Sequence, residues 1–95
     1  MLKPHDQPFF YRTADGAELD LVVETALKIR FAVEIKLSGK PQLSRGTTVA
    51  LEDLGNPPLL VVVPEGEPYP LREGVWVCGV DHMAELVEGF STEYI

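Results

Sequence analysis

Alternating polar and apolar residues characterise the first third of the chain. Residues 9–13 are a short aromatic-rich run, and residues 18–24 and 30–37 alternate with a period of two, which is typical of strands that bury one face. The Asp-Gly pair at residues 15–16 is a strong hairpin signal, because both residue types tolerate positive φ. We therefore predict a three-stranded antiparallel meander whose second turn falls in residues 25–29.

The hydrophobic period changes in the second half of the chain. One face of the helix predicted over residues 43–54 carries Leu43, Thr47, Ala50, Leu51 and Leu54 at helical spacing, and the Gly-Asn-Pro-Pro sequence that follows ends the helix. Residues 59–63 are continuously apolar, as in a strand that is covered on both faces. Residues 75–80 predict a further strand, and Asp81 is the expected N-cap of a short helix that ends at Val87.

These elements define the expected fold class. We treat residues 64–70 as a loop rich in proline, glutamate and glycine, so the predicted order is βββαββα. The chain is then one α/β (α+β) domain over residues 1–95, with a mixed central sheet that begins as an antiparallel meander.

Composition narrows the expected environment and partners. Of the 95 residues, 45% are hydrophobic, and the formal net charge is −7. The hydrophobic content predicts a packed core, whereas the acidity argues against non-specific binding of nucleic acid by this domain alone. No apolar run approaches the roughly 18 residues of a membrane span, and the first residues lack a signal-peptide core. With Cys78 as the single cysteine, no internal disulfide can form, and we expect a cytoplasmic protein.

The register of the second predicted hairpin determines which side chains share a face. With the turn centred on Leu27, one face carries only apolar pairs, namely Leu19–Ile35, Leu21–Val33 and Val23–Phe31. The other face carries mainly charged pairs, namely Glu18–Lys36, Asp20–Glu34, Val22–Ala32 and Glu24–Arg30. A slip by two residues would keep these faces and change the partners.

The charged face places two carboxylates opposite each other. Asp20 and Glu34 would repel if both were charged, so the protein must solvate both, protonate one or bind a cation between them. Two converging carboxylates suit Mg²⁺ or Mn²⁺, which prefer oxygen ligands and keep several waters. Lys36 lies two residues after Glu34 on the same face and would hold an attacking water or stabilise a phosphate. A solvated charged face is the competing interpretation of the same residues.

Other candidate residues carry a weaker signal. Glu18 shares the predicted charged face and is either a third acidic metal ligand or the partner of Lys36. Lys40 and Arg45 flank the start of the predicted helix and are candidate contacts for nucleic-acid phosphates, although solvated surface charges are the simpler interpretation of both. Cys78, within the last predicted strand, is expected to be a small buried hydrophobe.

The sequence resembles the PD-(D/E)xK nuclease superfamily. The resemblance rests on Asp20, followed after thirteen residues by Glu34-Ile35-Lys36 at the end of an apolar strand. It implies a restriction-endonuclease-like fold in which the Asp and Glu bind the divalent metal and the Lys assists the water. The core order of that superfamily, αβββαβ, matches the predicted order with the N-terminal core helix missing. Leu19 stands where the motif has proline.

A second resemblance covers nearly the whole chain, from about Phe9 to about Val87. The segments that carry it are FFYRTADGAELDLVVE, FAVEIKLS, LSRG, ALEDLG and VVVPEGEPYPLREGV. They are similar to the C-terminal domain of a large bacterial and archaeal family of AAA-type ATP-binding proteins, a domain of unknown function regarded as a relative of the PD-(D/E)xK fold. The chain has no Walker-type GxxxxGK[ST] loop, so we expect the C-terminal fragment of a longer ATPase. The missing helix would leave one side of the sheet uncovered, which predicts a homodimer.

Two functional hypotheses follow from these residues and resemblances. The first is a nuclease that uses Mg²⁺ or Mn²⁺ to hydrolyse phosphodiesters of DNA, with Asp20, Glu34 and Lys36 as its catalytic residues. The second is a non-catalytic module that mediates assembly with the ATPase portion of the same chain. The intact Asp, Glu and Lys favour the first hypothesis, whereas the acidic charge and the missing helix favour the second.

Overall fold

The computed structural model describes residues 5–26, 28–37 and 42–92 of the chain. The elements within these ranges are β1 (Gln7–Arg12), β2 (Glu18–Thr25), β3 (Lys28–Ile35), α1 (Arg45–Asp53), β4 (Leu59–Val63), β5 (Tyr69–Arg72), β6 (Val75–Gly79), the 3-10 turn η1 (Val80–His82) and α2 (Met83–Thr92). In this part of the chain, no helix is long and apolar enough to cross a membrane.

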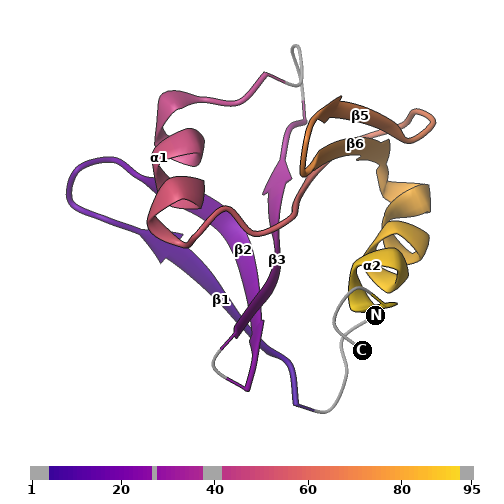
Figure 1. Cartoon of the computed structure of the whole chain (residues 1–95). Helices are drawn as coiled ribbons and strands as arrows, with labels where there is room; N and C mark the ends of the chain where they lie inside the picture. The colour runs from indigo at the N-terminus through magenta and orange to yellow at the C-terminus, as the bar shows by residue number, and fades with distance from the viewer. Residues whose placement is uncertain (1–4, 27, 38–41, 93–95) are drawn as a thin grey trace.

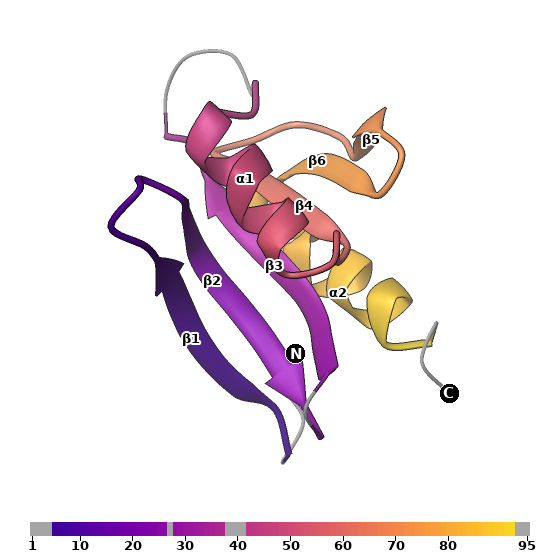
Figure 2. The ribbon, with the colours of Figure 1, turned by 60° about the vertical axis from the view of Figure 1, so that its left-hand side comes forward.

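The six strands form one mixed sheet in the order β1-β2-β3-β4-β6-β5. The first three strands are antiparallel neighbours, β4 runs parallel to both β3 and β6, and β5 is antiparallel to β6. The two helices lie on opposite sides of the sheet (Figure 1). Figure 2 shows α1 in front of the sheet and α2 behind it. The mixed α/β class and the antiparallel meander are therefore confirmed.

The central strand β4 packs side chains into both layers of the core. Leu59 and Val61 belong to the apolar cluster on the α1 side, whereas Leu60 and Val62 belong to the cluster on the α2 side. None of the four is more than 5% exposed, which confirms the prediction of a strand covered on both faces. Burying such side chains contributes about 1.5–3 kcal/mol each, so β4 anchors β3 beside it.

Local signals in the sequence determine where α1 begins and ends. The Ser44 hydroxyl accepts a hydrogen bond of 3.1 Å from the backbone N–H of Thr47 and caps the first turn. Gly55 and Asn56 have φ angles of 84° and 56°, the left-handed conformation that ends helices. The predicted helix is confirmed, with its first turn at Arg45.

The sequence pattern does not predict β5. The expected loop over residues 64–70 contains the start of this strand, so the observed order is βββαβββα. All four residues of β5 are exposed, and Pro70 lies within it. Proline lacks an N–H and is tolerated in an edge strand, and an exposed strand has no apolar alternation to reveal it.

The start of the last helix also differs from the prediction. Asp81 lies inside η1, whose N-cap is Gly79 and which no side chain caps. The helix α2 starts only at Met83, and its Val87 packs against the sheet. The prediction of Asp81 as the N-cap is therefore wrong, because a 3-10 turn separates β6 from α2.

The predicted register of β2 and β3 is correct in the middle of the hairpin. The observed pairs there are Leu21–Val33, Val22–Ala32 and Val23–Phe31. Near the turn, a register shift pairs Glu24 with Ile29 instead of Arg30. Arg30 forms a buried ion pair with Asp6 instead. The Glu24–Arg30 pair is therefore wrong, because the strands are irregular where they approach their turn.

The other end of β2 departs from regular alternation as well. Between the pairs Phe9–Val22 and Tyr11–Leu19, β2 has one residue more than β1. This bulge turns Leu19 to the α1 side, where it joins the same apolar cluster as Val22. The predicted pairing of Leu19 with Ile35 on one apolar face is therefore wrong.

Candidate metal centre

Glu34 is a buried carboxylate near the end of β3. Its side chain is on the α1 side of the sheet, like that of Ala32 two residues earlier, and Glu34 is only 7% exposed. The hydroxyl of Thr47 in α1, itself fully buried, donates a hydrogen bond to Oε2 of Glu34. The alternation of β3 therefore places this carboxylate beneath the first turn of α1.

Asp20 reaches the same position from β2. Its Oδ2 accepts a hydrogen bond of 2.7 Å from the backbone N–H of Ile35. The backbone pairing of β2 with β3 begins at Leu21 and Val33. The Asp20 carboxylate therefore accepts a backbone hydrogen bond from β3 beyond the last backbone pair of β2 and β3.

The Asp20 carboxyl group is close enough to Glu34 to affect its pKa. Burial is the largest cause that raises the pKa of Glu34 above its ordinary value, and the hydrogen bond with Asp20 and the charge of Asp20 raise it further. The hydrogen bond from Thr47 and the positive charge of Lys36 act in the opposite direction on this pKa. Two ionised carboxylates that share a site repel each other, so the position favours a proton or a cation.

Lys36 follows directly after β3. Its backbone N–H donates a hydrogen bond of 2.9 Å to the carbonyl of Val62 in β4, which keeps this part of the chain extended beside β4. The side chain of Lys36 is half-buried, and its charge lowers the pKa of Glu34. Asp20 and Glu34 therefore lie at neighbouring positions of β2 and β3, and the charge of Lys36 acts on the Glu34 carboxylate.

Other residues expected at the site lie elsewhere. The carboxylate of Glu18 faces Arg12 across β1 and β2 at 3.5 Å, and both side chains are exposed. In the described ranges, no three His, Cys, Asp or Glu side chains are grouped closely enough to hold a metal ion. Arg45 is exposed at the first residue of α1, and Lys40 is outside the described residues.

Two hydroxyl residues at this site were not predicted from the sequence. Thr47 falls on the apolar face of the predicted helix, and the structure shows that its hydroxyl meets Glu34. The Ser44 hydroxyl lies 3.0 Å from that of Thr47. A single polar residue on an otherwise apolar helix face is the available signal, because such a residue must find a polar partner when it is buried.

The donors at this position fit a small divalent cation. Mg²⁺ usually keeps several waters and is held by only one or two protein carboxylates. Asp20 and Glu34 provide two carboxylates from adjacent strands, and each has one oxygen that already accepts a hydrogen bond from Ile35 or Thr47. Preoriented carboxylates of this kind are the usual form of an acidic metal shell.

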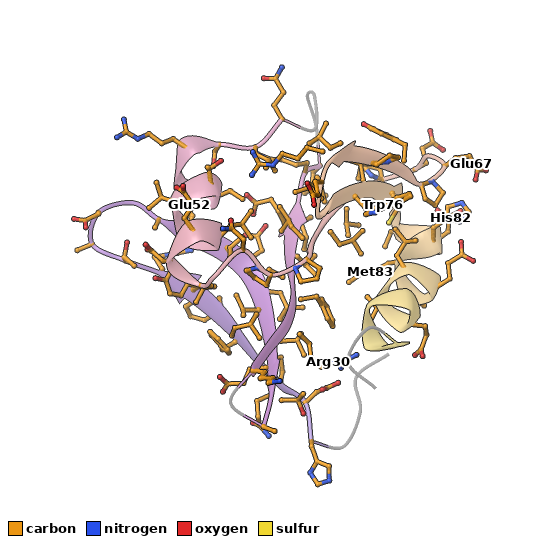
Figure 3. All side chains as sticks on the ribbon, viewed as in Figure 1. Arg30, Glu52, Glu67, Trp76, His82 and Met83 are labelled. Atoms are coloured by element: carbon orange, nitrogen blue, oxygen red, sulfur yellow. The ribbon has the colours of Figure 1, made fainter. Side chains whose placement is uncertain are left out.

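An apolar hollow of about 300 Å³ lies on the opposite, α2 side of the sheet. Its lining is formed by Leu21, Val33, Ile35, Leu37, Val62, Val63, Pro64, Val80 and Met83. The label on Met83 places it at the start of α2, next to the sheet (Figure 3). Three of the lining residues are strongly exposed, namely Ile35 at 51%, Leu37 at 79% and Val80 at 61%.

A second group of titratable side chains surrounds His82 on the surface. Its Nδ1 lies 3.0 Å from Glu85, and its Nε2 lies 3.6 Å from Glu67 and 3.7 Å from Asp81; Figure 3 shows His82 and Glu67 side by side. The hydrogen bond with Glu85 is the largest cause that raises the pKa of His82. Cys78 is fully buried nearby, as predicted, and burial raises the pKa of its thiol.

The fold and the site together define a small mixed α/β domain with an acidic pair on the neighbouring strands β2 and β3. The chain belongs to the family described as Domain of unknown function (DUF4143), which matches residues 2–83. No curated protein and no solved structure matches the chain.

Proposed function

We propose that this protein is a nuclease-like domain that hydrolyses phosphodiester bonds with the help of Mg²⁺ or Mn²⁺. The observation that carries the proposal is the Glu34 carboxylate, which is buried under α1 with the exposed Asp20 carboxylate and the charge of Lys36 close enough to affect its pKa. A carboxylate that is buried next to another one destabilises the fold unless a proton or cation lies between them. Such positions are typical of functional sites.

Each residue has a distinct part in the proposed reaction. Asp20 and Glu34 would hold the cation through their carboxylate oxygens. A bound divalent cation polarises a phosphate oxygen and makes a coordinated water more acidic. Lys36 would orient the attacking water or stabilise negative charge on the phosphate, and Arg45 at the start of α1 would contact a neighbouring phosphate.

The topology supports a relationship with the PD-(D/E)xK nucleases. The two acidic residues come from adjacent antiparallel strands, which a helix and a parallel strand then follow. We place the domain in a longer cytoplasmic AAA-type ATPase. Since this chain has a net charge of −7, basic surface in other parts of such a protein would strengthen its binding of DNA.

Binding of Mn²⁺ is the first test of the proposal. Calorimetric titration is expected to detect one site in the wild-type protein and no site in Asp20→Asn or Glu34→Gln. Glu52→Gln is the matched control, because it removes the same charge from an exposed position of α1 (Figure 3). A wild-type protein that does not bind Mn²⁺ would overturn the proposal.

Cleavage of DNA is the second test. With Mn²⁺ present, plasmid and branched DNA are expected to be cut by the wild-type protein, and Lys36→Ala is expected to bind Mn²⁺ but not to cut. Binding of Mn²⁺ without cleavage by the wild-type protein would leave a cation site and exclude hydrolysis by this domain alone.

The apolar hollow favours a second function, a non-catalytic interaction module. The elements that line the hollow also carry acidic residues, with Glu65 directly after one lining residue and Asp81 directly after another. We therefore propose a basic segment of a partner protein, with one large apolar side chain, as the occupant. This occupant complements both the hollow and the acidic surface around it.

Peptide binding tests this second function. The probe is a fluorescent synthetic helix of lysines and leucines, and anisotropy is expected to report saturable binding. Ile35→Ser and Leu37→Ser are expected to weaken binding about tenfold, whereas Glu52→Gln is expected to leave it unchanged. Equal binding by all four proteins would overturn the assignment, and concentration-dependent self-association would assign the hollow to a second copy of the chain.

A further inference from the structure

We infer that Thr47 makes the cation site selective for small octahedral cations, Mg²⁺ or Mn²⁺, over Ca²⁺. The inference rests on the proposed function, because it concerns the cation held by Asp20 and Glu34. It assigns to Thr47 the part of a positioning residue, which acts on the cation through Glu34.

The contacts of Thr47 fix the direction of its hydroxyl. Thr47 is fully buried, and its Oγ1 donates a hydrogen bond to Oε2 of Glu34. The Ser44 hydroxyl lies 3.0 Å from the same Oγ1 and accepts a hydrogen bond from the backbone N–H of Thr47. Because threonine is branched at Cβ, few rotamers are open to it. The helix backbone, the Ser44 cap and the branched side chain together thus hold the Thr47 hydroxyl against Oε2 of Glu34.

This arrangement limits how Glu34 can bind a cation. Thr47 donates to Oε2, and the Asp20 carboxylate on the neighbouring strand is close enough to affect the pKa of Glu34. The Thr47 hydroxyl takes one lone pair of Oε2 and fixes the direction of the carboxylate, which disfavours binding of one cation by both oxygens of Glu34. Ca²⁺ takes six to eight oxygen ligands and often uses both oxygens of one carboxylate, whereas Mg²⁺ requires a tight octahedron completed by waters. A carboxylate that binds through one oxygen therefore disfavours Ca²⁺.

Removal of the hydroxyl should relax this selectivity. In Thr47→Val the side chain keeps its shape, but Oε2 of Glu34 loses its donor and becomes available to a cation. In Thr47→Ser the hydroxyl remains. The neighbouring Thr48, whose hydroxyl donates to the backbone carbonyl of Ser44 at 3.2 Å, offers Thr48→Val as a matched control in the same helix turn.

Separate calorimetric titrations with Mn²⁺ and with Ca²⁺ measure the selectivity as a ratio of two affinities. Thr47→Val is expected to lower the ratio of Mn²⁺ to Ca²⁺ affinity about tenfold, as changes next to metal ligands commonly do. Thr47→Ser and Thr48→Val are expected to keep the wild-type ratio. A purely structural part for Thr47 would weaken the binding of both cations equally and leave the ratio unchanged.

The outcomes separate this inference from the proposed function. If the wild-type protein binds neither cation, the proposed function and the inference both fail. If it binds Mn²⁺ but Thr47→Val keeps the wild-type ratio, only the inference is overturned. Should Thr47→Val not fold, as judged by circular dichroism, Ser44→Gly takes its place. It removes the hydroxyl that aligns Thr47 and is expected to shift the ratio in the same direction, and an unchanged ratio there overturns the inference.

Discussion

Glu34 and Ile35 are neighbours in β3, yet each has the exposure that would be expected of the other. The charged residue is 7% exposed on the α1 side, while the apolar residue is 51% exposed on the α2 side. Charged side chains are seldom buried without a partner, and large apolar side chains are usually covered. The end of β3 therefore departs from the ordinary distribution on both faces.

The end of β3 has features that packing alone does not require. Earlier in β3, Phe31, Ala32 and Val33 are buried in the two apolar clusters. Arg30 is also buried in this strand, but it forms an ion pair with Asp6. Glu34, by contrast, is a buried carboxylate with a second carboxylate nearby, and Ile35 is an exposed apolar residue. Positions that oppose stability in this way are expected at binding sites, and the departure on each face corresponds to one of the two functions proposed above.

The largest expected effect comes from placing a charge where the α1 side is purely apolar. Ala32 is fully buried on the same face as Glu34. The hydrogen bonds of Thr47 and Asp20, however, are made with Glu34 and Ile35. Ala32→Asp is expected to lower the free energy of unfolding by about 3–5 kcal/mol, the effect of an unpaired buried charge. Urea denaturation measures it, with the exposed Ile35→Asp as the control. Equal losses in the two variants would show that the environment of Glu34 is not special.

A smaller effect of opposite sign is expected when Glu34 is neutralised. Without added cation, Glu34→Gln is expected to raise the free energy of unfolding at neutral pH by about 1 kcal/mol. The amide can still accept from Thr47 and can donate to Asp20. A destabilised Glu34→Gln protein at neutral pH would mean that the ionised carboxylate contributes to stability.

The pH dependence of this difference follows from the raised pKa of Glu34. An acid whose pKa is raised by folding destabilises the protein when ionised, so the penalty is absent below the unfolded pKa. The penalty grows as the pH rises from the unfolded pKa through the folded pKa. The stability difference between wild type and Glu34→Gln should therefore vanish in acid, and urea denaturation over a series of pH values, with Glu52→Gln as the control, measures it.

On the α2 side, removal of exposed apolar groups should hardly change stability. The double variant Ile35→Ser, Leu37→Ser is expected to change the free energy of unfolding by no more than about 0.5 kcal/mol, as for other surface substitutions. It should also bind less of a dye that becomes fluorescent on apolar surfaces. A large loss of stability would indicate that these side chains support the core instead of lining an open hollow.

The smallest expected effect concerns His82 at the edge of the α2 side. Its pKa is raised, chiefly by the hydrogen bond with Glu85, so the protonated ring stabilises the fold below the unfolded pKa. That contribution is lost as the pH rises through the folded pKa. His82→Gln is expected to lower the melting temperature in mildly acidic buffer and to leave it unchanged in alkaline buffer. An equal loss of melting temperature in both buffers would contradict the view that protonated His82 provides this stabilisation.

Sequence periodicity was sufficient for the elements that alternate or repeat regularly. The meander, the helix α1 and the strand β4 were predicted because their apolar residues follow one period. The proximity of Asp20 to Glu34 could also be predicted, since the pairs from Leu21–Val33 to Val23–Phe31 have the predicted register despite the shift near the turn.

The remaining features depend on irregularities that leave no periodic signal. A bulge turned Leu19 to the opposite face, and Glu18 paired with Arg12 on β1 rather than joining the acidic pair. Thr47 was placed on the correct helix face, but a helical pattern does not tell what that face meets. The contact with Glu34 depends on how α1 packs across the sheet, and packing is a tertiary property.

Both edge strands of the sheet contain a proline, which affects how molecules of the protein can associate with one another. Pro8 lies in β1 and Pro70 in β5, the two outer strands. Each proline removes an amide hydrogen from a rim that would otherwise offer a continuous template to other chains. The protein can thus expose apolar side chains at Ile35 and Leu37 while resisting the strand-by-strand growth that leads to fibrils.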